Sequence, residues 1–119
     1  MPVVLTNAGW ESQRHTHLLM QRHSNVHLEF SALQANRILE YLVRDFGDER
    51  LLFGSGGTEK SGGAARSLVD WAQIPVSSKR KIASENLVRL LGVDPPEHCP
   101  PPTPGVPFPA ADCLSLIHI

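Results

Sequence analysis

The chain has 119 residues, of which 41% are hydrophobic and 19% charged, and its formal net charge is −1. This balance is typical of a globular protein and gives no electrostatic reason to expect a nucleic-acid or membrane-surface partner. No apolar run reaches the roughly 18 residues that a transmembrane helix needs. The first residues, MPVVL, lack the charged region and the length of a signal peptide, so we expect a cytoplasmic protein.

Two similar units open the chain. Residues 2–6 (PVVLT) form a short run rich in β-branched residues, which predicts a buried strand, and residues 11–23 predict a helix after it. Residues 25–31 alternate apolar and polar side chains, which is typical of a strand. Residues 34–46 carry apolar side chains at helical spacing, and Gly47 stands where a helix C-cap belongs.

A third unit and a last helix follow. Residues 50–54 predict another buried strand, and residues 63–73 predict a helix that Pro75 ends. Ser77 or Ser78 is expected to cap the last helix, which continues to Gly92.

The alternation of strands and helices defines the expected fold class. Strands joined through helices and short loops run parallel, with right-handed crossovers. Three such strands alone have two bare edges and apolar residues on both faces. We therefore predict an α/β fold in which residues 1–92 are one part of a larger domain.

The remaining residues, 93–119, contain eight of the ten prolines and show almost no periodicity, so we expect a disordered tail. Its end, residues 114–119 (LSLIHI), is the peptide encoded by CTG TCT CTT ATA CAC ATC, which resembles a transposon mosaic-end adapter of sequencing libraries. We expect these six residues to be a sequencing artefact. Cys99 and Cys113 lie in the same tail, and we expect both to be reduced thiols.

Three phrases, in the correct order, resemble the amidohydrolase-related superfamily. Residues 45–55 (DFGDERLLFGS) resemble its last strand, residues 24–31 (SNVHLEFS) the preceding strand, and residues 81–91 (KIASENLVRLL) its closing helix. The resemblance runs from about Val3 to Gly92. It implies that this chain holds the last three βα units of a (β/α)₈ TIM barrel, which is incomplete here.

The resemblance also implies a function. Enzymes of this superfamily are metal-dependent hydrolases or nonoxidative decarboxylases of small organic substrates, and they use zinc or similar divalent metals. Their eighth-strand Asp corresponds to Gly56 here, and their sixth-strand His falls near Asn7. No metal ligand of the family can therefore be placed on this chain, and we expect it to be inactive by itself. The alternative is a non-catalytic barrel that binds a small ligand or a protein partner.

The second predicted strand carries the candidate catalytic residues. If its apolar residues face the helices, then His27, Glu29 and Ser31 face the barrel interior. Glu29 and Ser31 lie at the carboxyl end of the strand, where such barrels keep their active sites. Because an inward carboxylate is costly unless it is paired or functional, we predict catalytic roles for Glu29 and Ser31, with a structural ion pair of Glu29 as the alternative.

The same rim is expected to hold four substrate-binding residues, Asn7, Trp10, Ser55 and Glu59. Trp10 either packs under a substrate or covers the rim. Glu59 either replaces the absent Asp as a carboxylate at the barrel mouth or is simply solvated.

Two further patterns in the sequence look like functional motifs, but neither has the geometry or the residues of one. His15 and His17 have His-x-His spacing, but a helix directs them to nearly opposite sides, so we expect a solvated or partner-facing role rather than a metal site. Residues 54–61 (GSGGTEKS) are nearly a P-loop, yet Glu59 stands at the essential glycine and would repel phosphate. An alternative phosphate site would combine Lys60 with the backbone of residues 62–64.

Overall fold

The three predicted strands form one parallel sheet in the order β1–β2–β3, with β2 in the centre. The computed structural model describes residues 1–57 and 59–94. The strands are β1 (Val3–Leu5), β2 (Val26–Glu29) and β3 (Leu51–Leu52). Val3 pairs with Val26, and Leu28 pairs with Leu51. The protein is thus a small α/β fold on parallel strands, as the alternation of strands and helices predicted.

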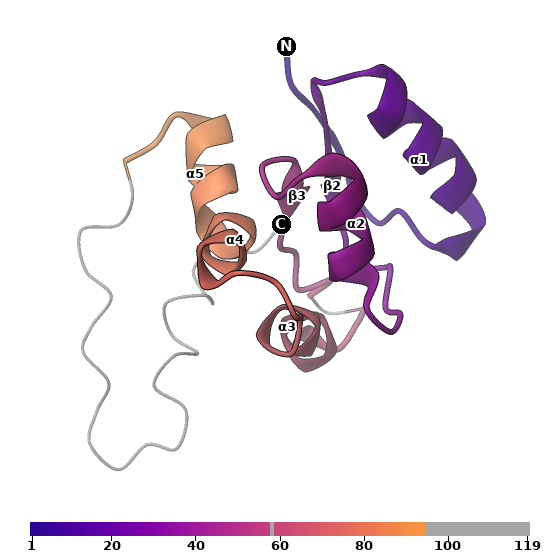
Figure 1. The fold of residues 1–119 in the computed structure, drawn as a ribbon, viewed down its shortest axis with the longest axis vertical. Coiled ribbons are helices and arrows are strands. Elements are labelled where there is room, and N and C mark those ends of the chain that lie inside the picture. The colour runs from indigo at the N-terminus through magenta and orange to yellow at the C-terminus, as the bar shows by residue number, and fades with distance from the viewer. Residues whose placement is uncertain (58, 95–119) are drawn as a thin grey trace.

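Helical segments follow each strand. In Figure 1, α1 and α5 lie on opposite sides of the sheet, and α2 lies in front of the strands. The segments are the 3₁₀ turn η1 (Trp10–Ser12), α1 (Gln13–Arg22), α2 (Ile38–Phe46), α3 (Gly62–Asp70), α4 (Val76–Arg80), the π-helical stretch η2 (Lys81–Glu85) and α5 (Asn86–Leu91). The last three form one continuous helical stretch. Among residues 1–57 and 59–94, no helix is long and apolar enough to cross a membrane.

Two boundaries in the middle of the chain differ from the prediction. The helix predicted over 34–46 begins only with α2, because Arg37 before it has a left-handed backbone with a φ of 57°. The strand predicted over 50–54 is limited to the two residues of β3. The N–H group of Phe53 leaves the sheet and donates to the carbonyl oxygen of Ile82 at 3.0 Å.

The prediction for the last two helices was partly wrong. The helix predicted over 63–73 ends with α3, so Pro75 does not end it but stands directly before α4. Neither Ser77 nor Ser78 caps a helix, since both lie inside α4. The hydroxyl group of Ser78 instead donates to Oδ2 of Asp48 at 2.6 Å, which ties α4 to the loop before β3.

Gly47 and Gly92 end α2 and α5, as predicted. Their φ angles are 77° and 62°, a left-handed region that glycine adopts without the Cβ clash of other residues. After α5, the N–H group of Val93 donates to the carbonyl oxygen of Val88 at 3.4 Å, so the helix end is closed by the backbone itself.

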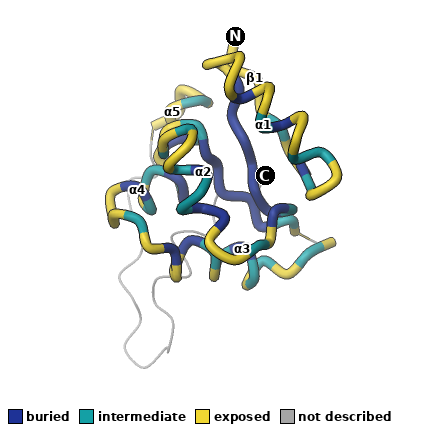
Figure 2. Tube along the Cα trace, turned by 45° about the vertical axis from the view of Figure 1, so that its right-hand side comes forward, coloured by how far each residue is buried: buried dark blue, intermediate teal, exposed yellow. Residues whose placement is uncertain are grey.

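The hydrophobic core lies around the central strand. Leu28, Phe30 and Leu51 have no exposed surface, and helix residues such as Met20 and Leu39 pack with them. All four residues of β2 are buried, including the polar ones, so both faces of the strand are covered. β2 and β3 are buried along their whole length, whereas β1 and the outward faces of the helices include exposed residues, drawn yellow in Figure 2.

The outer edge of β3 is closed by the last helical stretch. The N–H group of Leu28 donates to the carbonyl oxygen of Arg50, so alternation directs the peptide groups of Leu51 and Phe53 to the opposite edge. There, Nδ2 of Asn86 donates to the carbonyl oxygen of Leu51 at 2.9 Å, and the bond from Phe53 to η2 lies beside it. A helix therefore covers this edge in place of another strand.

The outer edge of β1 is open within residues 1–57 and 59–94, since the sheet contains no strand beyond it. Val3 and Val4, whose side chains point to opposite faces, are 39% and 38% exposed. The predicted tail from residue 95 onwards, including both cysteines and residues 114–119, lies outside the described residues.

Candidate functional site

A cavity of about 270 Å³ lies at the carboxyl ends of the parallel strands. The loops after β1, β2 and β3 all contribute to it, because parallel strands end at the same edge of a sheet. Its lining residues are Thr6, Asn7, Glu29, Ser31, Gly56, Gly57, Glu59 and Lys60. Four of the six predicted site residues therefore meet at one place, although up to 52 positions separate them in the sequence.

Glu29 is the buried carboxylate of this cavity, with only 3% of its surface exposed. Its Oε1 accepts a hydrogen bond from the N–H group of Ser31 at 2.5 Å, and its Oε2 accepts one from the N–H group of Asn7 at 3.2 Å. Within residues 1–57 and 59–94, Glu29 takes part in no ion pair. Two backbone amides satisfy the carboxylate instead, and they tie the ends of β1 and β2 together.

Gly54 makes room for Glu29. A Cβ atom at this position would lie 2.7 Å from Cγ of Glu29 and closer still to the carboxylate, so any side chain would displace it. Gly54 stands at the end of the third predicted strand. Glycine at a strand end is a signal that another group approaches the backbone closely, and that signal was available.

Lys60 connects the loops after β1 and β3. Its ammonium group donates to Oδ1 of Asn7, 53 positions earlier in the chain. Asn7 has a φ of 54°, a left-handed conformation that Asn tolerates better than most residues. The sequence suggested a phosphate site that would combine Lys60 with the backbone of residues 62–64. The structure instead places its ammonium group beside Asn7.

Of the other predicted site residues, Ser55 and Trp10 lie outside the cavity lining, whereas Glu59 is part of it. Ser55 is 5% exposed and accepts a hydrogen bond from the N–H group of Gly57 at 3.2 Å, so it shapes the loop but does not line the cavity. Trp10 is 54% exposed and also lies outside the cavity lining. Glu59 is exposed, which agrees with the solvated alternative, and it lines the cavity as well.

The residues at this cavity do not fit a divalent metal ion. Within residues 1–57 and 59–94, no three His, Cys, Asp or Glu side chains are grouped so that they could hold one. The cavity holds two carboxylates, Glu29, which two amides already engage, and the exposed Glu59; Lys60 lines it as well, and a cationic neighbour disfavours cation binding. We therefore derive no reaction step through a metal.

The two histidines of α1 have separate surroundings, as their helical spacing predicted. His15 is exposed. His17 packs on α2, with its ring centroid 4.8 Å from that of Phe46, and its Nε2 lies 3.0 Å from Nε2 of Gln21. His17 is half-buried because its ring lies between α1 and α2, so it is less solvated than expected.

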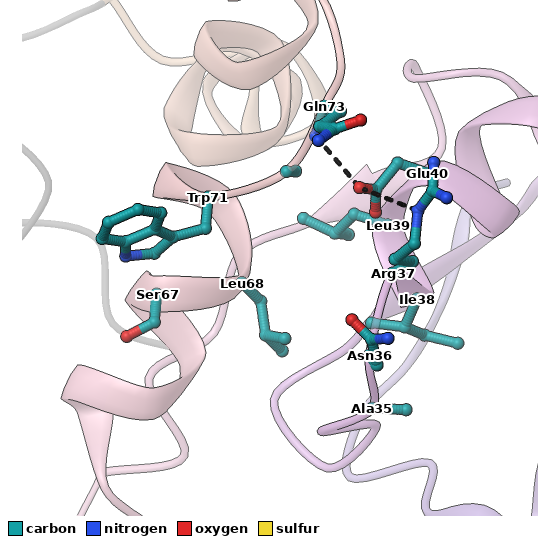
Figure 3. Close-up of a pocket in the computed structure, with 11 residues that line it drawn as sticks. Ala35, Asn36, Arg37, Ile38, Leu39, Glu40, Ser67, Leu68, Trp71 and Gln73 are labelled. Carbon is teal, nitrogen blue, oxygen red and sulfur yellow. Dashed lines mark hydrogen bonds and ion pairs between the residues drawn. The ribbon is translucent and has the colours of Figure 1, made fainter.

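A second cavity, of about 300 Å³, lies between α2 and α3 (Figure 3). Glu40 stands at its rim, where it accepts a hydrogen bond from the N–H group of Gln73 at 3.0 Å and pairs with Arg37 at 3.7 Å. Trp71 also lines the cavity, and 84% of its surface is exposed. None of the predicted site residues lines this cavity, and it shares no lining residue with the cavity at the strand ends.

Comparison of the chain with models of protein families, with curated proteins and with solved structures gives no match.

Proposed function

We propose that this chain supplies the carboxyl-terminal part of an amidohydrolase-related (β/α)₈ barrel that hydrolyses or decarboxylates a small, carboxylate-bearing organic substrate. The observation that carries the proposal is the convergence of Asn7, Glu29, Ser31 and Lys60 at one cavity at the carboxyl ends of three parallel strands. Barrel enzymes hold their active sites at this end, because the loops there can vary without disturbing the sheet.

The outer edge of β1 supports a barrel, whereas the outer edge of β3 would have to change its hydrogen bonds for a barrel to close. Consecutive strands lie side by side, and the open edge of β1 suits pairing with a preceding strand. Barrel closure requires the outer edge of β3 to pair with the first strand. The bonds that Ile82 and Asn86 make there would then have to be exchanged for strand pairing.

Each residue at the cavity has a role that its chemistry suits. The Lys60 ammonium group would leave Asn7 and bind the substrate carboxylate, since an ion pair with a ligand is stronger than a bond to an amide oxygen. Glu29 would accept a proton, because each of its oxygens makes one hydrogen bond and retains a further acceptor site. The hydroxyl group of Ser31, next to Glu29, would orient the substrate.

Sequencing the genomic locus on both sides of this coding region tests the barrel. We expect five further strand–helix units upstream, with His-x-His on the first strand, and loss of residues 114–119. In the complete protein, Glu29→Gln should lower kcat/KM by about 10²- to 10⁴-fold, the usual contribution of a general acid or base. The exposed Glu11→Gln serves as the matched control. An upstream region without such units, or a Glu29→Gln variant with full activity, would refute the proposal.

A second candidate function is a non-catalytic domain that binds a small ligand or a protein partner. The observation in its favour is that Glu29 and Lys60 are both satisfied by groups of the chain itself. Metal analysis of the complete protein separates the two candidates. Stoichiometric zinc, iron or manganese would exclude the non-catalytic domain. A metal-free, inactive protein that still binds a small carboxylate would exclude the hydrolase.

A further inference from the structure

A larger cavity, of about 460 Å³, lies at the opposite end of the sheet, where β2 and β3 begin. Its lining includes Ser24, His27 and Arg50 from the sheet region, and Arg89 from α5. It shares no residue with the cavity at the carboxyl ends of the strands. Neither the resemblance nor the proposed function assigns it a role.

Two arginines are held in place at this cavity. Arg50 donates from Nη1 to the carbonyl oxygens of Met20 and His23 at 2.8 and 3.1 Å, and its guanidinium carbon lies 5.5 Å from the ring centroid of Phe46. Arg89 donates from Nη2 to the carbonyl oxygen of Glu49 at 2.8 Å. Each guanidinium group has five N–H donors, so these bonds orient both groups and leave further donors available.

The carboxylates of the cavity are largely engaged by other groups. Asp48 accepts hydrogen bonds from Ser78 and Lys81, and these two contacts lower its pKa against the opposing effect of burial. Glu49 pairs with Lys81 at 3.7 Å and with Arg89 at 4.0 Å. Among the lining residues, two arginines stand against these two carboxylates, and Lys81, which does not line the cavity, pairs with both carboxylates, so the charges of the arginines are only partly neutralised.

His27 adds a buried polar group without a partner. Only 8% of its surface is exposed, and its Nδ1 has no hydrogen-bond partner within the described residues. Burial, and then the charges of Arg89 and Arg50, lower the pKa of His27 below 6.5. The imidazole is therefore neutral at pH 7, in a positive field, and it can carry its proton on either nitrogen.

We propose that this cavity binds a small phosphate-type oxyanion, with Arg50 and Arg89 as its charged ligands. Planar guanidinium groups match the oxygen pairs of such an anion. His27 lines the same cavity, and its neutral ring would lie beside the bound anion. The anion would be either free phosphate or the phosphate group of an ester.

The test is an NMR titration of the ¹⁵N-labelled full chain with inorganic phosphate, at constant ionic strength and with chloride as the reference anion. We expect saturable shifts at the side chains of Arg50 and Arg89 and at the imidazole nitrogens of His27. Glycerol phosphate is titrated in parallel. Tighter binding than phosphate supports an ester as the ligand, and equal or weaker binding supports the free anion.

Variants decide whether the proposed groups hold the anion. Arg89→Gln should weaken binding about tenfold, because one of two charged donors is lost. Arg66→Gln, which removes an arginine of α3 paired with Asp70, should leave binding unchanged. Arg89→Lys keeps the charge and should bind at an intermediate strength, which tests the site should Arg89→Gln fail to fold. The proposal is overturned by three outcomes: no saturable shift, shifts centred on Lys60 and residues 62–64, or equal binding by wild type and Arg89→Lys.

Discussion

Nδ2 of Asn86 lies 2.9 Å from the carbonyl oxygen of Leu51, 35 positions earlier, so a helix side chain satisfies the outer edge of a strand. The same nitrogen donates to the carbonyl oxygen of Asp48 at 2.7 Å. Asn86 is only 1% exposed, so water cannot replace these bonds. Together with the bond from Phe53 to Ile82, this contact gives the outer edge of β3 the hydrogen-bond partners that a neighbouring strand would otherwise provide.

Asn86→Leu should destabilise the protein strongly. The substitution keeps the volume but leaves the carbonyl oxygens of Asp48 and Leu51 without this donor, at a cost of about 1–3 kcal/mol for each buried group. The free energy of unfolding from urea denaturation measures the effect. Asn36→Leu, at an exposed position, is the matched control and should change stability by less than about 0.5 kcal/mol. Equal stability of the two variants would contradict the role of Asn86.

Gly54→Ala should destabilise the protein by about 1–3 kcal/mol, as overpacking does, because the new Cβ would overlap Glu29. Gly63→Ala is the control, since its Cβ would meet nothing nearer than Oγ of Ser61 at 3.7 Å. In helix α3 that change should be neutral or stabilising by up to about 1 kcal/mol. Thermal unfolding of both variants checks the difference, and a Gly54→Ala protein as stable as Gly63→Ala would mean that Glu29 is not held as described.

The free energy of unfolding should fall as the pH decreases below 6.5, because His27 is harder to protonate in the folded protein than in the unfolded chain. Its pKa is lowered in the folded protein by burial and by the charges of Arg89 and Arg50. Below pH 6.5 the unfolded chain therefore binds a proton that the folded protein does not, and unfolding is favoured until the lower folded pKa is reached. His27→Gln should flatten this part of the profile of unfolding free energy against pH, whereas His23→Gln, at an exposed position, should not. Parallel profiles for wild type and His27→Gln would refute this assignment.

The open edge of β1 should cause self-association of the chain. An unpaired strand edge with half-exposed valines is a template for pairing with another chain. Val4→Lys should reduce association in sedimentation velocity, because a charged side chain would be forced into the contact. Val76→Lys is the control, since Val76 is 68% exposed at the start of α4, away from the sheet. The idea fails if Val4→Lys associates as much as Val76→Lys.

The predictions from sequence were most accurate for local structure. β-branched runs and helical periodicity located β1, β2 and most of α1 and α2, because these patterns depend on neighbouring residues. Gly47 and Gly92 ended their helices as predicted, since a left-handed residue favours glycine wherever it occurs. Periodicity did not locate the start of α2, because the left-handed backbone of Arg37 is not visible in a pattern of hydrophobicity.

The sequence by itself determined the parallel α/β class, the order of strands and helices, and the position of Asn7, Glu29, Ser31 and Glu59 at strand ends. Only the tertiary structure decided that Glu29 is satisfied by two backbone amides, that Lys60 reaches Asn7, and that Asn86 closes the edge of β3. The physical reason is the distance along the sequence between the groups that interact. Strand and helix preferences come from residues within a few positions, whereas these hydrogen bonds mostly join groups tens of residues apart, which only packing brings together.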